Sequence, residues 1–151
     1  MNRMALALLT VALSSVAQAQ FPTGTWVQRG DTTRFSMTVD RAGSGYRLTY
    51  TLIDRKGKVL NPNMLTMVTQ LDGKDAVVYD AHGKPTAQTI AVTRIDAHHT
   101  HSVMKVNGRV YGTSDAELSG DAKLIKIVND MSAMGNGVAQ AGKKIDYWDK
   151  K

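Results

Sequence analysis

The chain contains no cysteine among its 151 residues, which excludes any disulfide bond and any lipid attached to a cysteine. A fold of this chain must therefore be held together by burial of apolar side chains and by backbone hydrogen bonds alone. Proline and aromatic residues are also few, with three Pro, two Phe and two Trp. A single domain of this length can bury enough apolar surface to be stable without disulfide bonds.

Long runs of charge are missing as well. The chain has 19 Lys and Arg against 13 Asp and Glu, for a formal net charge of +6, and no basic run exceeds two residues. Nucleic-acid-binding proteins usually concentrate positive charge on one face or one helix. We therefore expect no nucleic-acid partner, and we interpret the charge as a solvated basic surface that could touch acidic envelope polymers.

No apolar run is long enough to span a bilayer as a helix. The longest, Ala5 to Val16, follows Arg3 and precedes Ala17-Gln18-Ala19. A positive start, a short apolar segment and an A-x-A site are typical of a secretory signal peptide. We therefore predict a signal peptide over residues 1–19 and a single domain over residues 20–151, exported to the periplasm or beyond as a soluble protein. A core helix at the N-terminus is the alternative interpretation.

Motifs of catalysis are absent too. The sequence has no G-x-S-x-G nucleophile elbow, no H-E-x-x-H and no glycine-rich phosphate loop. Its acidic residues stand mostly in turn-like contexts, which turn chemistry explains without acid–base catalysis. We expect no enzymatic activity and no cofactor, although a catalytic site assembled from scattered strand residues is the alternative.

What the sequence does have is a period of two, which indicates β-strands. Apolar residues alternate with polar ones in "RFSMTV" (34–39), in "YRLTYTL" (46–52) and in "AQTIAVTRI" (87–95). Turn signals separate these segments, among them "RAGSG", "DRKGK", Asp72-Gly73, Asn107-Gly108, "SGDAK" and "GNG". Asp-Gly and Asn-Gly favour two-residue type I′ hairpins.

Strand signals that recur every 8–12 residues or so, joined by hairpins, are typical of an all-β sandwich or barrel. We predict an all-β fold, an up-and-down antiparallel β-barrel of about eight to ten strands with low helix content, because closure removes exposed strand edges. Pro62 should mark a break or an edge. One short turn of helix is expected around Asp130 to Met134.

The segment "GTW" at Gly24 to Trp26, together with a meander that ends in "KIDYWDK", resembles the lipocalin-like or calycin barrels. More closely, segments such as "GTWVQRGDTTRFS" and "VNGRVYGT" resemble a group of small exported bacterial lipocalin-like proteins, most of which lack a defined activity. The resemblance implies that Trp26, backed by Gly24, closes one barrel end. It also implies a basic residue of the last strand over Trp26, for which Lys143, Lys144 and Lys150 are available.

Histidine and methionine raise the question of a metal. His99 and His101 share one face of a strand, so two imidazoles could chelate Zn²⁺ or Cu²⁺, but no further ligands stand at a recognisable spacing. "MLTM" and "MSAM" have a spacing that Cu(I) could use only in a loop or a helical turn. We interpret the histidines as a polar hairpin and the methionines as adaptable filler, and we expect no bound metal.

The barrel interior remains as the candidate site. Arg94 and Gln88 continue an otherwise apolar inward face, and Arg94 would need an internal Asp, the open mouth or a ligand carboxylate as its partner. The predicted function is non-covalent binding of a small apolar or amphipathic molecule by a monomer. The alternatives are a solid barrel that acts through its outer surface in the envelope, and a metal-handling protein. The predicted ligand-binding residues are Phe35, Met37, Tyr46, Leu48, Tyr50, Ile90, Val92, Arg94 and Tyr111.

Overall fold

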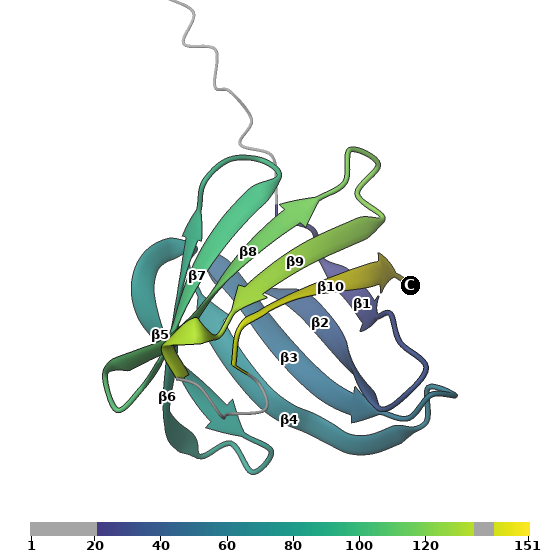
Figure 1. The fold of residues 1–151 in the computed structure, drawn as a ribbon, viewed down its shortest axis with the longest axis horizontal. Coiled ribbons are helices and arrows are strands. Elements are labelled where there is room, and N and C mark those ends of the chain that lie inside the picture. The colour runs from purple at the N-terminus through teal and green to yellow at the C-terminus, as the bar shows by residue number, and fades with distance from the viewer. Residues whose placement is uncertain (1–20, 135–140) are drawn as a thin grey trace, which may run out of the picture.

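Ten antiparallel strands follow one another along the chain and wind about a common axis (Figure 1). They are seen in a computed structural model that describes residues 21–134 and 141–151. The strands are β1 (Gly24–Gln28), β2 (Arg34–Ala42), β3 (Gly45–Ile53), β4 (Val59–Thr69), β5 (Asp72–Asp80), β6 (Pro85–Arg94), β7 (His99–Val106), β8 (Arg109–Leu118), β9 (Leu124–Asp130) and β10 (Lys143–Lys150). The predicted signal peptide, residues 1–19, and the predicted "GNG" turn at 135–137 lie outside the described residues.

Each strand pairs with its neighbours in sequence, and β10 returns to pair with β1, so the barrel is closed. Trp26 of β1 stands opposite Lys150 of β10 and opposite Met37 of β2. This arrangement confirms the predicted all-β, up-and-down antiparallel barrel at the upper end of the expected strand number. The one helical segment in the described residues is the short 3₁₀ helix η1 (Ser132–Met134), where the sequence predicted a single turn. Across the described ranges, no helix is long and apolar enough to cross a membrane.

The three alternating segments of the sequence lie in β2, β3 and β6, as predicted. The Asn-Gly hairpin is also confirmed: Asn107 and Gly108 join β7 to β8 with φ angles of 50° and 75°. A type I′ turn needs positive φ at both central residues, which Asn and Gly adopt at little cost.

The Asp72-Gly73 signal is displaced from its turn. The two residues between β4 and β5 are Gln70 and Leu71, and Leu71 carries a φ of 57°. Asp72 already begins β5 and pairs with Thr93 of β6, and Gly73 follows as an irregularity in that pairing. The dipeptide therefore marks a bulge beside the turn rather than the turn itself.

Pro62 lies within β4, at the break that its missing N–H predicts. Leu52 of β3 pairs with Asn61, whereas Tyr50 pairs with Leu65, so β4 carries extra residues around Pro62. Asn63 in this stretch has a φ of 48°, and its backbone N–H donates to Thr51 Oγ1 at 3.2 Å. The strand is thus kinked without leaving the sheet.

The core fills the end of the barrel at which β1 begins and β2 ends, which we call the closed end. Trp26 and Val39 have no exposed surface there, and Tyr46 and Leu71 pack beside them. Phe21, just before β1, covers this core: its ring lies 5.2 Å from that of Tyr46, and its backbone N–H donates to Tyr46 Oη at 3.1 Å. The Phe21 ring therefore covers the core at the closed end.

Candidate functional site: a cavity inside the barrel

Above the closed end the barrel holds a cavity of about 190 Å³. This volume is smaller than the roughly 300–1,000 Å³ of sites for drug-sized ligands. It exceeds the roughly 150 Å³ of an apolar cavity that holds one benzene. The interior can therefore take a compact molecule with a ring or a short chain, but no long lipid in full.

One wall of the cavity is apolar. It is formed by β2, β3, β4 and β6 together with Leu71, which lies in the turn between β4 and β5. The members on β2, β3 and β6 come from the alternating segments of the sequence. Met37 and Met67 are 4% and 3% exposed, and the other members are also buried except Ile90, which is partly buried. Methionine adapts its shape to what it contacts, so this wall can adjust to a guest. The apolar wall consists of Met37, Leu48, Met67, Leu71, Ile90 and Val92.

The opposite wall, from β7 to β10, combines apolar side chains such as Met104, Ile125 and Ile127 with a row of polar ones. Ser102 of β7 stands opposite Ser114 of β8, and Ser114 stands opposite Asn129 of β9. Asn129 in turn donates from Nδ2 to Oδ2 of Asp146 on β10, at 3.0 Å. All four line the cavity. We call Ser102, Ser114, Asn129 and Asp146 the polar row; it crosses four neighbouring strands.

Two aromatic side chains join the walls. Tyr50 and Trp148 meet edge to face with ring centroids 6.3 Å apart, and both line the cavity. Burial raises the pKa of Tyr50 to about 12, so its hydroxyl stays protonated and can donate. Trp148 is 5% exposed, and its Nε1 has no hydrogen-bond partner within 21–134 and 141–151.

Five of the nine predicted ligand-binding residues line this cavity: Met37, Leu48, Tyr50, Ile90 and Val92. The other four, Phe35, Tyr46, Arg94 and Tyr111, lie elsewhere. Phe35 packs against the core, and its backbone N–H donates to Gln28 Oε1. Tyr111 is half-buried and hydrogen-bonded to Gln88, at an irregularity between β7 and β8.

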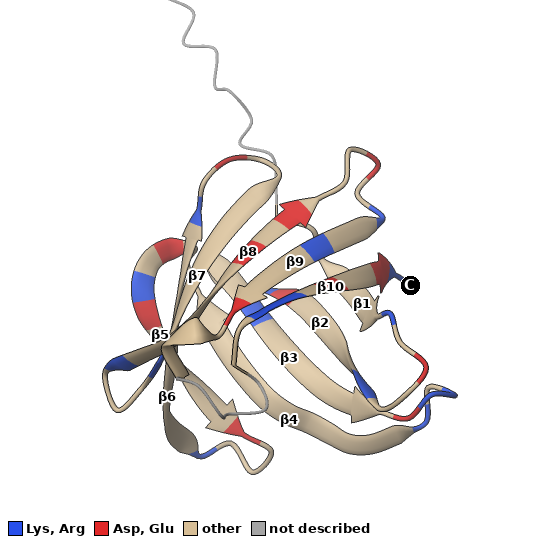
Figure 2. Cartoon of the chain, viewed as in Figure 1, with Lys and Arg blue, Asp and Glu red and all other residues tan. Residues whose placement is uncertain are grey.

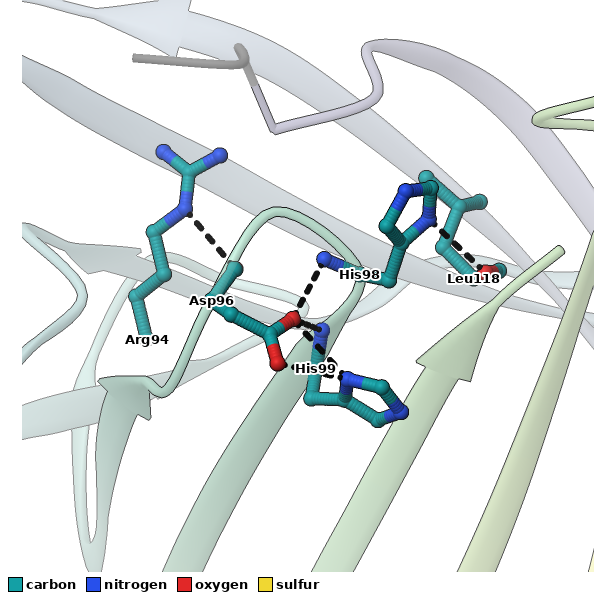
Figure 3. A network of polar contacts seen from close by, with 5 residues as sticks. All are labelled: Arg94, Asp96, His98, His99 and Leu118. Carbon is teal, nitrogen blue, oxygen red and sulfur yellow. Dashed lines mark hydrogen bonds and ion pairs between the residues drawn. The ribbon is translucent and has the colours of Figure 1, made fainter. Parts of the chain in front are cut away.

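Tyr46 and Arg94 belong to the closed end. Tyr46 accepts the N–H of Phe21, and the guanidinium of Arg41 lies 4.9 Å from its ring centroid. Arg94 Nε donates to the backbone carbonyl of Asp96 at 3.2 Å (Figure 3). Its side chain borders a small hollow beside Phe21, outside the main cavity. The predicted place for a ligand carboxylate at Arg94 thus adjoins the cavity but lies outside its lining.

Trp26 is fully buried in the core, and Gly24 begins the same strand β1 two residues before it. Lys150 Nζ lies 5.6 Å from the ring centroid of Trp26, so a lysine takes the position of the basic residue that the resemblance implied. A Cβ at Gly24, whose φ is 112°, would lie 3.3 Å from Lys150 Cε. Glycine leaves room for this lysine to cross toward the indole.

His98 and His99, where the β6–β7 loop enters β7, form hydrogen bonds with Asp96 of that loop. The Asp96 carboxylate accepts the backbone N–H groups of His98 and His99, and His99 Nδ1 lies 2.9 Å from both of its oxygens (Figure 3). The His98 N–H and then His99 hold the pKa of Asp96 below its usual range. His101 Nδ1 instead pairs with Asp115 at 2.7 Å.

The two predicted metal candidates therefore face different carboxylates. Within the part of the chain that the structure describes, no three His, Asp or Glu side chains are grouped so as to hold a metal ion. The arrangement explains His99 as a partner of the Asp96 loop and His101 as a partner of an exposed strand residue.

Charged side chains are spread around the barrel, with blue and red segments alternating mainly along loops and strand ends (Figure 2). Several form ion pairs on the outside. Arg29 binds Asp149 with two hydrogen bonds of 2.7 Å, and this contact lowers the pKa of Asp149. Lys105 Nζ lies 2.9 Å from Asp75. Asp146 differs from the other acids in these pairs because its side chain is only 13% exposed and faces the cavity.

The sequence did not single out the polar row or Trp148. "THSVMKV" offers Val103 and Ser102 as alternatives for the inward face, and hydrophobicity alone favours Val103. Trp148 offered a signal that could have found Asp146. If the indole of Trp148 points into the barrel, Asp146, two residues earlier, must lie on the same inward face of the strand.

Comparison with known proteins adds no assignment: no protein-family model matches the chain, and no curated protein matches it.

Proposed function

We propose that this protein is an exported, non-catalytic barrel that binds one small apolar or amphipathic molecule in its interior. The observation that carries the proposal is a cavity of about 190 Å³ in which an apolar wall faces polar groups. Ligand sites combine these two features, with apolar lining for affinity and a few polar groups for orientation. The proposed export rests on the signal-like sequence of residues 1–19.

The polar groups give this proposal its weight. The indole N–H of Trp148 lines the cavity, is buried and has no hydrogen-bond partner among the described residues, and the half-buried side chains of Ser102 and Ser114 line the same cavity. Polar groups withdrawn from solvent are normally hydrogen-bonded, because leaving them unpaired costs free energy. A barrel interior that served packing alone would use apolar side chains at these positions.

The test is binding of indole, a ring-sized neutral probe, followed in two-dimensional amide NMR spectra. We expect saturable shifts of cavity residues at one site per chain. Ala116→Phe places a ring in the cavity, since Ala116 lines it, and should abolish these shifts. Glu117→Phe adds the same ring to the next residue of β8, which is exposed, and should leave binding intact.

Native mass spectrometry of protein from its own host provides the second measurement, and a stoichiometric co-purifying small molecule is expected. If indole shifts no cavity residue and nothing co-purifies, the cavity does not bind ligands. A barrel that acts through its outer surface would then be the better account.

A further inference from the structure

We propose that the ligand carries a cationic amine, and that Asp146 binds this amine within the cavity. The inference rests on the proposed function, since it names the chemistry of the molecule in the same cavity. It starts from the one ionisable acid in the described cavity lining. Carboxylates held away from solvent need a cation or several hydrogen bonds to offset their lost hydration.

The surroundings of Asp146 leave room for such a cation. Its Oδ2 accepts one hydrogen bond from Asn129, at 3.0 Å, and its Oδ1 lies 3.1 Å from Lys144 Nζ. A carboxylate has about four acceptor positions, so these two contacts do not exhaust it. Lys144 is 71% exposed and does not line the cavity, whereas Asp146 does. Asp146 is therefore the one charged side chain in the described cavity lining, and Lys144 pairs with it from outside that lining.

The strand itself is arranged to present this carboxylate. Residues two apart share a face of a strand, so Asp146 and Trp148 point inward together. Ile145 and Tyr147, between and beside them, face outward and are 52% and 38% exposed. An apolar residue was thus available in the neighbouring position, yet the inward position holds an acid. Such a departure from hydrophobic-inside patterning is expected at functional sites.

The aromatic neighbours suit the same ligand. Trp148 and Tyr50 line the cavity on the side of β10 and β3, and electron-rich ring faces attract ammonium groups. The unpartnered Trp148 Nε1 and the Ser102 and Ser114 hydroxyls offer further polar contacts to a ligand that enters this part of the barrel. The apolar wall opposite is suited to a hydrocarbon ring or a short chain attached to the amine. The ligand class is therefore a small primary amine with one ring-sized apolar group.

The overall charge of the chain works against this preference. The formal net charge is +6, so long-range attraction favours anions over cations. A preference for an amine over a neutral or anionic molecule of the same shape must consequently arise from local contacts. This makes the comparison of matched probes informative.

The experiment uses three probes of similar shape: 2-phenylethylamine, 2-phenylethanol and 3-phenylpropionate. Their dissociation constants are measured by NMR titration of the full barrel. We expect the amine to bind at least about tenfold more tightly than the alcohol, as expected for a hydrogen bond to a charged group. The carboxylate should bind no better than the alcohol.

Two variants locate the effect. Asp146→Asn keeps the shape and removes the charge, and should reduce the preference for the amine to about twofold or less while the alcohol binds as before. Asp115→Asn is the matched control, because Asp115 lies on the outer face of β8 with its side chain 66% exposed; the preference should persist. Lys144→Ala removes the cation that competes with the amine for the Asp146 carboxylate, and it should strengthen amine binding several-fold. This variant tests the same contact if Asp146→Asn does not fold.

The outcomes separate this inference from the proposed function. If the alcohol binds but the amine has no advantage, or if 3-phenylpropionate binds best and loses affinity in Lys144→Ala, the amine site is refuted and the binding barrel stands. If none of the three probes binds, the proposed function fails with it.

Discussion

Replacement of Trp26 by alanine should be among the most destabilising single changes in this barrel. The side chain has no exposed surface and lies between β2 and β10 in the core of the closed end. A buried aromatic residue covers about 150–250 Å², which at about 25 cal/mol per Å² corresponds to about 4–6 kcal/mol. Loss of the Lys150 ammonium contact adds about 0.5–1 kcal/mol.

An opposing effect reduces this cost. Trp26 Nε1 is buried and has no hydrogen-bond partner in the described parts of the chain. An unpaired buried donor costs about 1–3 kcal/mol, which alanine relieves. The expected net loss is about 3–5 kcal/mol, in the range measured for large aromatic residues removed from cores. Trp26→Phe keeps most of the ring and also removes the unpaired N–H, so it should cost only about 1 kcal/mol.

The assay is urea unfolding followed by tryptophan fluorescence. The chain has two Trp, so in both variants Trp148 alone reports. With a slope of about 1.5 kcal/mol per M, a loss of 3 kcal/mol lowers the midpoint by about 2 M. Tyr147→Ala, on the outer face and 38% exposed, is the control and should cost about 1 kcal/mol or less. A Trp26→Ala midpoint that stays within the range of this control would refute the assignment of Trp26 to the closed end.

Two further predictions concern the backbone and the loop beside the closed end. Gly45→Ala should destabilise the barrel by about 1–3 kcal/mol, because the added Cβ would lie 2.4 Å from the carbonyl oxygen of Thr69. Gly120→Ala is the control and should be near neutral, because the space around Gly120 is open. Equal unfolding midpoints for the two variants would contradict the crowding at Gly45. The pKa of Asp96 is held below 3.8 by N–H groups that form only in the folded loop, so its contribution to stability is present above pH 3.8 and is lost as the pH falls through the lower, folded pKa. Asp96→Asn should therefore lose less stability than the native chain between neutral pH and pH 3, as measured by urea unfolding at each pH, and an unchanged pH dependence would argue against this role.

The architecture could be read from the sequence because it depends on a pattern that repeats. Period-two alternation places every second side chain on one face, and the hairpin at Asn107-Gly108 needs nothing but its own φ angles. The displaced turn at Asp72-Gly73 shows the limit: pairing of Asp72 with β6 decides where β5 begins, and local sequence carries no information about that partner.

The candidate site was only partly predictable for a related reason. Met37 and Phe35 share a face of β2, so alternation treats them alike, yet Met37 lines the cavity and Phe35 does not. Their difference is a position along the barrel axis, which is set by the stagger of all ten strands. Tyr111 adds a second limit, because the irregularity between Met104 and Lys105 changes which side chains of β8 continue the inward face.

The strand β10 shows most clearly why a hydrophobic pattern alone misplaces the site. In "KIDYWDK" the apolar residues Ile145 and Tyr147 would be assigned to the core, yet both are exposed, and Asp146 and Trp148 face inward. Packing of Trp148 into the core fixes this register, since a shift by one residue would turn every side chain of the strand over. The opposite arrangement would bury Ile145 and Tyr147 and place Asp146 in solvent, but it would also expose Trp148, which is 5% exposed. The observed strand exposes Ile145 and Tyr147 and keeps the Asp146 carboxylate in the cavity lining, and this is the arrangement that the proposed amine ligand would use.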